Sequence, residues 1–263
     1  MRETINLKGL VLRTTRVKEN DKYLDILTDS LGRISVYSHG TRSYKSRNSA
    51  VADMFRYAEF TVTKSGAGYT LKESCEIAGF YQLMNDLTRL ALAQYLCDVI
   101  CDIAQEETPE EDILRTALNA LYALSSTGIS PAAVKAVCEL RFAADAGFMP
   151  ELGSCLACGR RPGEDPGWIL NISEGGILCP DCAEKLDIRD RYFENGKPKP
   201  FAALPPQTLA AMRHILTSDP KKCFGFKLDE VGMSMLSAAA EGYLLYHLDR
   251  RFTTLDFYRS CAV

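Results

Sequence analysis

The chain has 263 residues, of which 46% are hydrophobic and 25% charged, and its formal net charge is −3. These values are typical of a globular protein with two or three small domains, and they exclude a uniformly basic nucleic-acid binder. The charge is uneven, because residues 1–50 carry ten Lys and Arg against five Asp and Glu, whereas residues 76–115 carry two against nine. The N-terminal part can therefore attract an anion. We interpret the acidic run Glu106–Asp112 as the exposed start of a helix, where carboxylates suit the helix dipole.

Neither a secretory signal nor a transit peptide is predicted, because Met1–Asn6 has no apolar core. The most apolar late stretch, Val231–Leu248, contains Ser, Glu and His side chains that a membrane-spanning helix would place in hydrocarbon at high cost. We predict a packed core helix there and no membrane partner. Six cysteines occur singly, as expected of reduced thiols in a cytoplasmic protein: Cys75, Cys97, Cys101, Cys138, Cys223 and Cys261.

The first 80 residues have the pattern of a β domain. Runs rich in β-branched and aromatic residues are separated by turn-forming sequences such as Asp29–Gly32 and Ser65–Gly68. We predict strands over Ile5–Val17, Tyr23–Thr28, Arg33–Ser38, Tyr57–Ser65 and Tyr69–Ile77. Five short strands in this length suit a small barrel, and the OB-fold is one option.

From Phe80 onward the apolar residues recur at helical spacing. Ser130 and Pro131 provide an N-cap and a proline at the first helical position, and that helix should end at Gly147. Two later helices are predicted near Pro206–Thr217 and over Asp229–Phe252, packed against the earlier ones. The predicted fold class is therefore α+β. Its domains are a barrel (residues 1–79), a helical domain in two parts (80–150 and 188–263) and an inserted zinc ribbon (151–187).

Two Cys-x-x-Cys pairs form the strongest motif. Cys155 with Cys158 and Cys179 with Cys182 can each direct two thiolates at one ion, at Zn–S distances of about 2.3 Å, and twenty residues separate the pairs. Gly159 follows the first pair, where the chain must turn tightly. Two small strands, Trp168–Ile172 and Gly176–Leu178, would bring the pairs together. We predict one structural zinc ion bound by these four cysteines.

The alternatives to a structural zinc site need elements that the sequence lacks. A thioredoxin-type redox pair needs a strand before it and a long helix after it, and a catalytic zinc needs an open ligand position. A base deaminase would need a His- or Cys-x-Glu element upstream of Cys179–Cys182. His39, His214 and His247 lie in separate modules, without a phosphate loop or a nucleophile motif. We therefore predict no catalytic residues, no small-molecule substrate and no enzyme activity.

The segment His39–Asn48 combines three cations, one aromatic residue and no aliphatic side chain. A segment of this composition does not bury itself. Its cations could follow a phosphate backbone, while Tyr37, Tyr44 or Phe55 could stack on an unpaired base. A basic loop is more often simply solvated, so the pattern alone is a weak indication of nucleic-acid binding.

Several segments resemble a known family. Near the N-terminus these are Gly9-Leu10-Val11-Leu12-Arg13, Glu19-Asn20-Asp21 before Leu24–Thr28, Gly32-Arg33-Ile34, and Gly40-x-Arg42-x-x-Lys45-Ser46-Arg47. Later ones are Arg141-Phe142 through Ala146-Gly147-Phe148-x-Pro150, then the cysteine pairs, then Tyr243–Leu248 with Arg250-Arg251. In content and order, over nearly its full length, the chain resembles the bacterial recombination mediator family RecO.

The resemblance implies an N-terminal OB-fold, a helical domain with a zinc ribbon, and a role in DNA repair at the nucleoid without bond cleavage. The protein would bind single- and double-stranded DNA and anneal complementary strands. With RecR, it would help to load RecA onto strands coated by single-stranded DNA-binding protein (SSB). The motif match makes Arg42, Lys45, Arg47 and Arg33 the expected DNA contacts.

The resemblance also implies that the acidic C-terminal tail of SSB binds the helical domain. We predict that contact at Arg141 and Phe142, although Phe142 as a core residue fits the sequence equally well. Two other function classes stay open. One is a zinc-ribbon module that binds RNA or the transcription machinery, and the other is a zinc-stabilised scaffold that binds only proteins.

Overall fold

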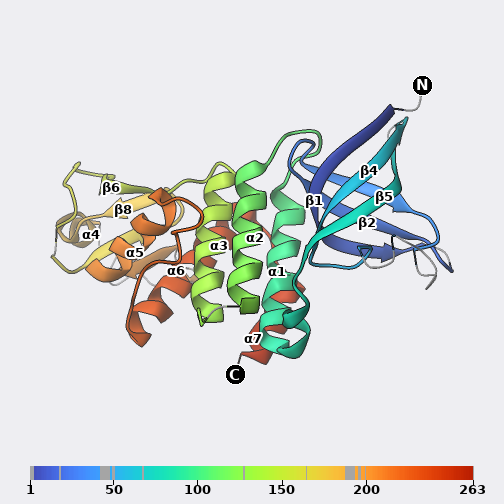
Figure 1. The fold of residues 1–263 in the computed structure, drawn as a ribbon. Helices are drawn as coiled ribbons and strands as arrows, with labels where there is room; N and C mark the ends of the chain where they lie inside the picture. Colours follow the sequence, from blue (N-terminus) through green and yellow to red (C-terminus); the bar gives the residue numbers. More distant parts are fainter. Residues whose placement is uncertain are drawn as a thin grey trace. The chain divides into compact units, whose positions relative to one another are not determined.

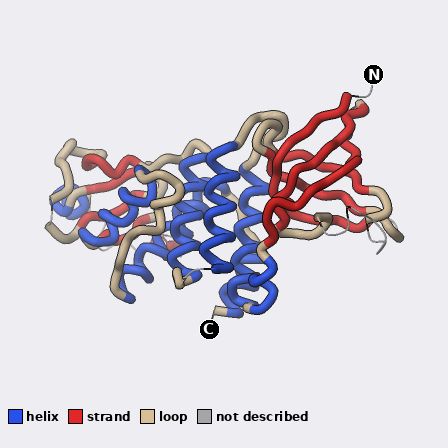
Figure 2. The backbone as a smooth tube through the Cα atoms, viewed as in Figure 1, coloured by secondary structure: helices blue, strands red, loops and turns tan. Residues whose placement is uncertain are grey.

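The structure is a computed structural model that describes residues 3–17, 19–41, 48, 51–66, 68–126, 128–163, 165–186, 193–194, 197–198 and 200–262. Its contacts divide the chain into two compact units, an N-terminal unit (Met1–Gly128 with Phe252–Val263) and a C-terminal unit (Ile129–Arg251). The first unit holds a barrel and helices, and the second holds helices and a smaller sheet (Figures 1 and 2). Among the described residues, no helix combines the length and apolarity needed to cross a bilayer.

Five strands form a closed barrel in the N-terminal unit (Figure 1): β1 (Glu3–Arg16), β2 (Lys22–Thr28), β3 (Arg33–Ser38), β4 (Arg56–Ser65) and β5 (Gly68–Gly79). Their order is β1-β2-β3-β5-β4, and β1 also pairs with β4. The β3–β5 pair is parallel and the others are antiparallel. This is the strand order of an OB-fold, so the predicted fold class is confirmed.

Strand β1 closes the barrel because it is long and irregular. Its first half pairs with β4 and its second half with β2, and the register shifts between Val11 and Arg13. A Cβ at Gly9 would lie 2.5 Å from Ile26 Cγ2, so glycine allows β2 to approach this closely. Alternate apolar side chains fill the interior, including Val11, Leu24, Ile26, Val36, Phe60 and Val62.

The helices of the N-terminal unit are α1 (Leu87–Ile103), α2 (Glu111–Ser126) and α7 (Thr253–Cys261), with a 3-10 turn, η1 (Tyr81–Asn85). Asp86 caps α1 by accepting a hydrogen bond from the Arg89 backbone N–H. Asp98 on α1 joins three elements, because it accepts hydrogen bonds from Arg13 of β1 (2.8 Å) and Thr254 of α7 (2.9 Å).

The prediction of one helix over Asp229–Phe252 is wrong at its C-terminal end. Helix α6 spans Glu230–Leu248, and the residue that follows it, Asp249, has a left-handed φ of 48°. A left-handed residue after the last turn ends a helix, and glycine is the usual residue there. Because Asp249 replaces that glycine, the sequence carried only a weak stop signal, and α7 was missed.

In the C-terminal unit, α6 packs against α3 (Pro131–Asp145) and α5 (Pro206–Thr217). Ser130 caps α3, as predicted, by accepting a hydrogen bond from the Ala133 N–H. Between α3 and α6, the buried Lys135 ammonium lies 2.9 Å from Glu139 and 2.7 Å from Glu241. Both acids therefore compensate a charge that would be costly to bury alone.

The second sheet has the order β11-β7-β8-β6: β6 (Glu151–Cys155), β7 (Trp168–Asn171), β8 (Gly176–Leu178) and β11 (Phe201–Leu204). A short helix, α4 (Pro180–Lys185), follows β8, and β9 (Phe193–Glu194) pairs with β10 (Lys197–Pro198). Strands β7 and β8 confirm the two predicted strands. Strands β6 and β11 were not predicted, and the sheet around the cysteines is larger than expected.

Candidate functional site

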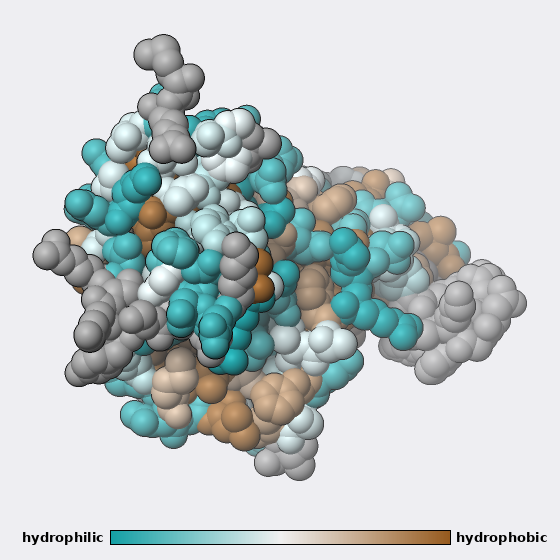
Figure 3. Space-filling view, turned by 90° about the vertical axis from the view of Figure 1, so that its right-hand side faces the viewer, coloured by the Kyte–Doolittle hydropathy of each residue, from teal (hydrophilic) through white to brown (hydrophobic). Residues whose placement is uncertain are grey.

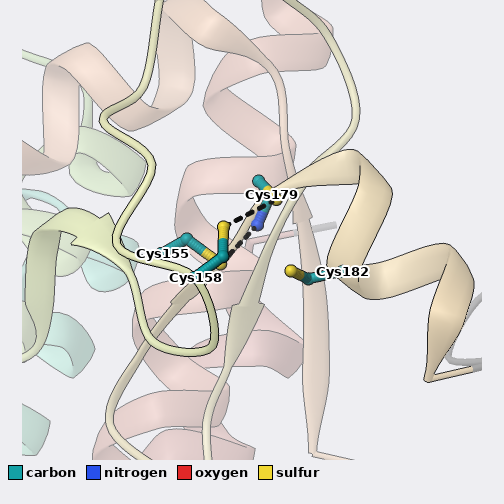
Figure 4. Close-up of side chains that lie close together, drawn as sticks. All are labelled: Cys155, Cys158, Cys179 and Cys182. Carbon is teal, nitrogen blue, oxygen red and sulfur yellow. Dashed lines mark hydrogen bonds between the residues drawn. The ribbon is translucent and has the colours of Figure 1, made fainter.

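Four cysteines from two separated segments converge at one end of the second sheet (Figure 4). Cys155 ends β6, Cys179 follows β8, and Cys182 lies in the first turn of α4. Their ligand atoms and that of Cys158 all lie within 4.8 Å of one another. The structure therefore brings together all four residues that the sequence predicted, in an arrangement that could hold one metal ion.

The local backbone explains how each pair presents its sulfurs. After Cys155 the chain turns back, so that the Cys155 N–H donates to the Arg160 carbonyl (2.8 Å) and the Gly159 N–H donates to the Cys155 carbonyl (2.9 Å). Gly159 has a left-handed φ of 74°, a conformation that glycine adopts without strain. The Cys179 N–H then points at the Cys155 sulfur, 3.3 Å away. Such N–H···S contacts stabilise a thiolate.

Electrostatics at the four thiols favours exchange of protons for a cation. Burial opposes ionisation of Cys155, yet backbone N–H groups, first that of Cys179, lower its pKa to about 6. The neighbouring thiols, Cys179 and then Cys158, raise the pKa of Cys182 to about 12. One site thus ionises readily while another holds its proton, and a dication can displace the remaining protons.

The ligand set favours a thiophilic ion in a closed site. Four sulfur ligands complete a tetrahedron and leave no position for a reacting water. Arg160 supports the centre, because it donates to Asp181 of α4 (3.0 Å) and to Asp165 (2.9 Å). The Trp168 side chain is fully buried on β7. The arrangement therefore suits a structural role, in which the ion holds two turns and one sheet together.

A second candidate surface lies on the barrel, where Tyr23 of β2 and Tyr37 of β3 are directly paired across the strands. Their ring centroids are 5.3 Å apart, and the rings meet edge to face. They border an open depression of about 450 Å³ whose other walls are Val17, Ser35, Ser65, Gly68, Tyr69 and Thr70. Tyr23 is 41% exposed, so an unpaired base could stack there.

This depression lies where an OB-fold usually binds oligonucleotides, on strands β2 and β3 between the β1–β2 and β4–β5 connections. Seen from the barrel side, much of the described surface is hydrophilic (Figure 3). The sequence analysis proposed Tyr37 as a stacking residue but not Tyr23. Tyr23 can be recognised as its partner only from the strand register, which pairs the two residues.

The predicted DNA contacts Arg42, Lys45 and Arg47, and also Tyr44, lie outside the described residues. Asn48, the last residue of the basic segment His39–Asn48, is described. Its amide donates to the Lys72 carbonyl (3.2 Å) and accepts a hydrogen bond from Ser74 (2.8 Å), both on β5. The segment that carries the predicted cations is thus joined to the barrel wall at this residue.

Two other predicted residues face the interior or a neighbouring loop. Phe55 is 2% exposed and has a left-handed φ of 62°, so the idea that it stacks on a base is wrong. Arg33 begins β3, and its guanidinium lies 3.6 Å from Glu106 and 3.5 Å from the Ala104 carbonyl. The Arg33 side chain is only 27% exposed, and its guanidinium contacts the connection that follows α1.

The two residues predicted to bind the SSB tail, Arg141 and Phe142, differ from each other in burial and contacts. Phe142 is fully buried in the core of the C-terminal unit, which was the alternative interpretation of the sequence, and it offers no surface to a partner. Arg141 donates through Nη1 to the carbonyls of Ile215 (3.0 Å) and Ser218 (2.9 Å) at the end of α5. The guanidinium thus neutralises a helix C-terminus.

Two family models match the chain in order: Recombination protein O N terminal at residues 1–81 and Recombination protein O C terminal at residues 84–192. The chain is 28% identical over 256 residues to a DNA repair protein RecO of Acetivibrio thermocellus, which covers 97% of this chain and 96% of that protein. It is also 26% identical over 255 residues to a DNA repair protein RecO of Caldicellulosiruptor bescii. That alignment covers 97% of this chain and 98% of the relative. The family matches thus extend over the barrel and the four-cysteine region alike, and the chain belongs to the RecO family of DNA repair proteins.

Proposed function

We propose that this protein is a recombination mediator that binds single- and double-stranded DNA and anneals complementary strands. With RecR, it would help to load RecA onto single strands coated by SSB. Family membership gives the repair role. The observation that carries the DNA-binding part is the tyrosine pair, Tyr23 and Tyr37. Tyr37 lies two residues before the segment His39–Asn48, which contains Arg42, Lys45 and Arg47.

Annealing requires two properties of a protein surface. Cations must neutralise the phosphates of two strands that repel each other, and the bases must stay accessible for pairing. Aromatic rings hold single-stranded bases without selecting a sequence, because every base has a face that stacks. Neither step breaks a covalent bond or needs a nucleophile. We therefore propose a binding protein rather than an enzyme, acting at the nucleoid.

The four cysteines would hold one zinc ion. A tetrahedral set of thiolates suits zinc, and the ion would supply cross-links between the two turns and so stabilise the second sheet. This role leaves DNA binding to the barrel. The acidic tail of SSB would bind the C-terminal unit, with Arg141 as the proposed cation.

The proposal is tested by comparing the affinity for single-stranded DNA, duplex DNA and structured RNA at one salt concentration. We expect the tightest binding to single-stranded DNA and measurable binding to the duplex. Tighter binding to structured RNA would contradict the proposal and favour an RNA-associated module. A protein that binds none of the three nucleic acids would be a scaffold for proteins.

A further inference from the structure

A buried carboxylate, that of Asp21, contacts one member of the tyrosine pair, Tyr37. Asp21 precedes β2 and is only 4% exposed. Its Oδ2 accepts a hydrogen bond from the Tyr37 hydroxyl (2.5 Å), and its Oδ1 accepts one from the Gly40 N–H (2.9 Å). His39 Nδ1 lies 2.8 Å from the same Oδ1. One carboxylate therefore serves three donors from a single stretch of chain.

Those three donors lie at the end of β3 and in the two residues that follow Ser38. Tyr37 belongs to the last part of β3, and His39 and Gly40 begin the segment that carries the predicted cations. Gly40 has a left-handed φ of 65°, a conformation that glycine adopts without strain, and its N–H is held by Asp21. Through these contacts Asp21 fixes both the Tyr37 ring and the first residues of the basic segment.

The charge of Asp21 is unfavourable for a surface that binds phosphates. A nearby anion repels a polyanion, so a purely electrostatic view predicts that DNA affinity rises when the carboxylate is removed. The hydrogen bonds from Tyr37 and then Gly40 hold the pKa of Asp21 below its usual value. The residue is therefore ionised at neutral pH, and its hydrogen bonds are the strong, charge-assisted kind.

We propose that Asp21 is a positioning residue for single-stranded DNA: it holds the Tyr37 ring in the orientation in which a base would stack on it, and it fixes the backbone at His39 and Gly40 just after β3. This inference rests on the proposed function and adds a residue that touches no DNA itself. It predicts a change in DNA affinity opposite in sign to the change that simple electrostatics predicts. Removing this negative charge should weaken DNA binding.

The experiment compares Asp21→Ala with Asp53→Ala in the full chain, using an oligothymidine as the probe. Asp53 is a matched control, because its exposed carboxylate pairs with the Lys22 ammonium on the same barrel (2.8 Å) and its loss changes the charge equally. We expect Asp21→Ala to weaken binding about tenfold, the size of one lost charged hydrogen bond. Asp53→Ala should bind the probe as tightly as wild type or more tightly.

Two further variants cover the case in which Asp21→Ala unfolds. Asp21→Asn keeps one acceptor oxygen and should retain part of the affinity, and Tyr37→Phe removes a single hydrogen bond and should lose part of it. Thermal unfolding identifies any variant that is not folded. Faster hydrogen exchange at the Gly40 amide in the folded variants would show that the start of the segment is released.

The inference is overturned if folded Asp21 variants bind the probe as tightly as wild type, or more tightly, while wild type binds it well. The proposed function then stands. Wild-type protein that binds no single strand overturns both, because nothing is left for Asp21 to position.

Discussion

At the scale of single residues, the four-cysteine centre has a built-in reporter. Trp168 is the only tryptophan in the chain, and it is fully buried on β7, in the sheet that carries Cys155. Loss of a structural metal removes part of the folding free energy of a small module. The surroundings of the indole should therefore change when the metal leaves.

We predict that Cys158→Ser lowers the zinc content from about one ion per chain to near zero, because three thiolates and a hydroxyl bind zinc far more weakly than four thiolates. Tryptophan emission should shift to longer wavelength. Cys75→Ser is the matched control, since Cys75 is an exposed cysteine on β5, outside the cluster. Full zinc content in Cys158→Ser would show that the cysteines do not act as one site.

Sequence reasoning identified the chemistry of single residues better than their exposure. The spacing of the four cysteines was sufficient to predict that they lie together, because the geometry of metal ligands restricts that spacing strongly. Phe142 was ambiguous, since helical periodicity marks a stripe of apolar residues without showing which face is covered. Arg141 could not be recognised as a partner of α5, because its contacts with Ile215 and Ser218 are 74 and 77 residues away in the chain.

At the scale of elements, the turn between β2 and β3 is fitted closely to the connection after α1. Gly32 has a left-handed φ of 59°, and a Cβ there would lie 2.2 Å from the Gln105 carbonyl oxygen and 2.3 Å from that of Thr108. The Arg33 N–H donates to the same Gln105 carbonyl (3.0 Å). This contact is between backbones, so a side chain cannot be accommodated by rotating a rotamer.

Gly32→Ala should therefore destabilise the protein by about 2–4 kcal/mol, through overpacking as well as an unfavourable φ. Gly66→Ala separates these two causes, because Gly66 has nearly the same φ (60°) but a Cβ added there would meet nothing within 4 Å. It should cost only about 1 kcal/mol. Urea unfolding measures both values, and equal losses would contradict the close contact at Gly32.

The strands of the barrel could be predicted to within two residues, because each is bounded by turn chemistry and filled with β-forming residues. Elements without such signals were missed. β11 is a short run, Phe201–Leu204, between prolines, and its pairing with β7 depends on residues some thirty positions earlier. The strand order follows from long-range pairs such as β1 with β4 and β3 with β5, which no local pattern specifies. The Tyr23–Tyr37 pair depends instead on the register of the β2–β3 hairpin.

The basic segment gives a further prediction at this scale. Replacing Arg42, Lys45 and Arg47 together by Ala should lower the slope of log affinity against log salt by about two for single-stranded DNA, at about 0.7 per lost phosphate contact. Thermal stability should hardly change, because a segment without aliphatic side chains adds little to a core.

The double variant Lys221→Ala and Lys222→Ala is the control, because it removes cations from the C-terminal unit instead. It should leave the salt slope as in wild type. The opposite result, an unchanged slope in the triple variant and a reduced slope in the control, would place DNA binding in the C-terminal unit.

At the scale of the whole molecule, the two candidate sites lie in different units. The N-terminal unit carries the barrel face with Tyr23 and Tyr37, and the C-terminal unit carries the four-cysteine centre. Metal binding and DNA binding should thus respond to different substitutions.

The central claim is tested most directly by following the annealing of complementary DNA strands that are both coated with SSB. The account predicts that the wild-type protein accelerates annealing well beyond the rate of the coated strands alone, and that the Arg42, Lys45 and Arg47 triple variant loses most of this acceleration while it keeps its zinc. A wild-type protein that binds zinc, is fully folded and leaves the annealing rate of coated strands unchanged would contradict it.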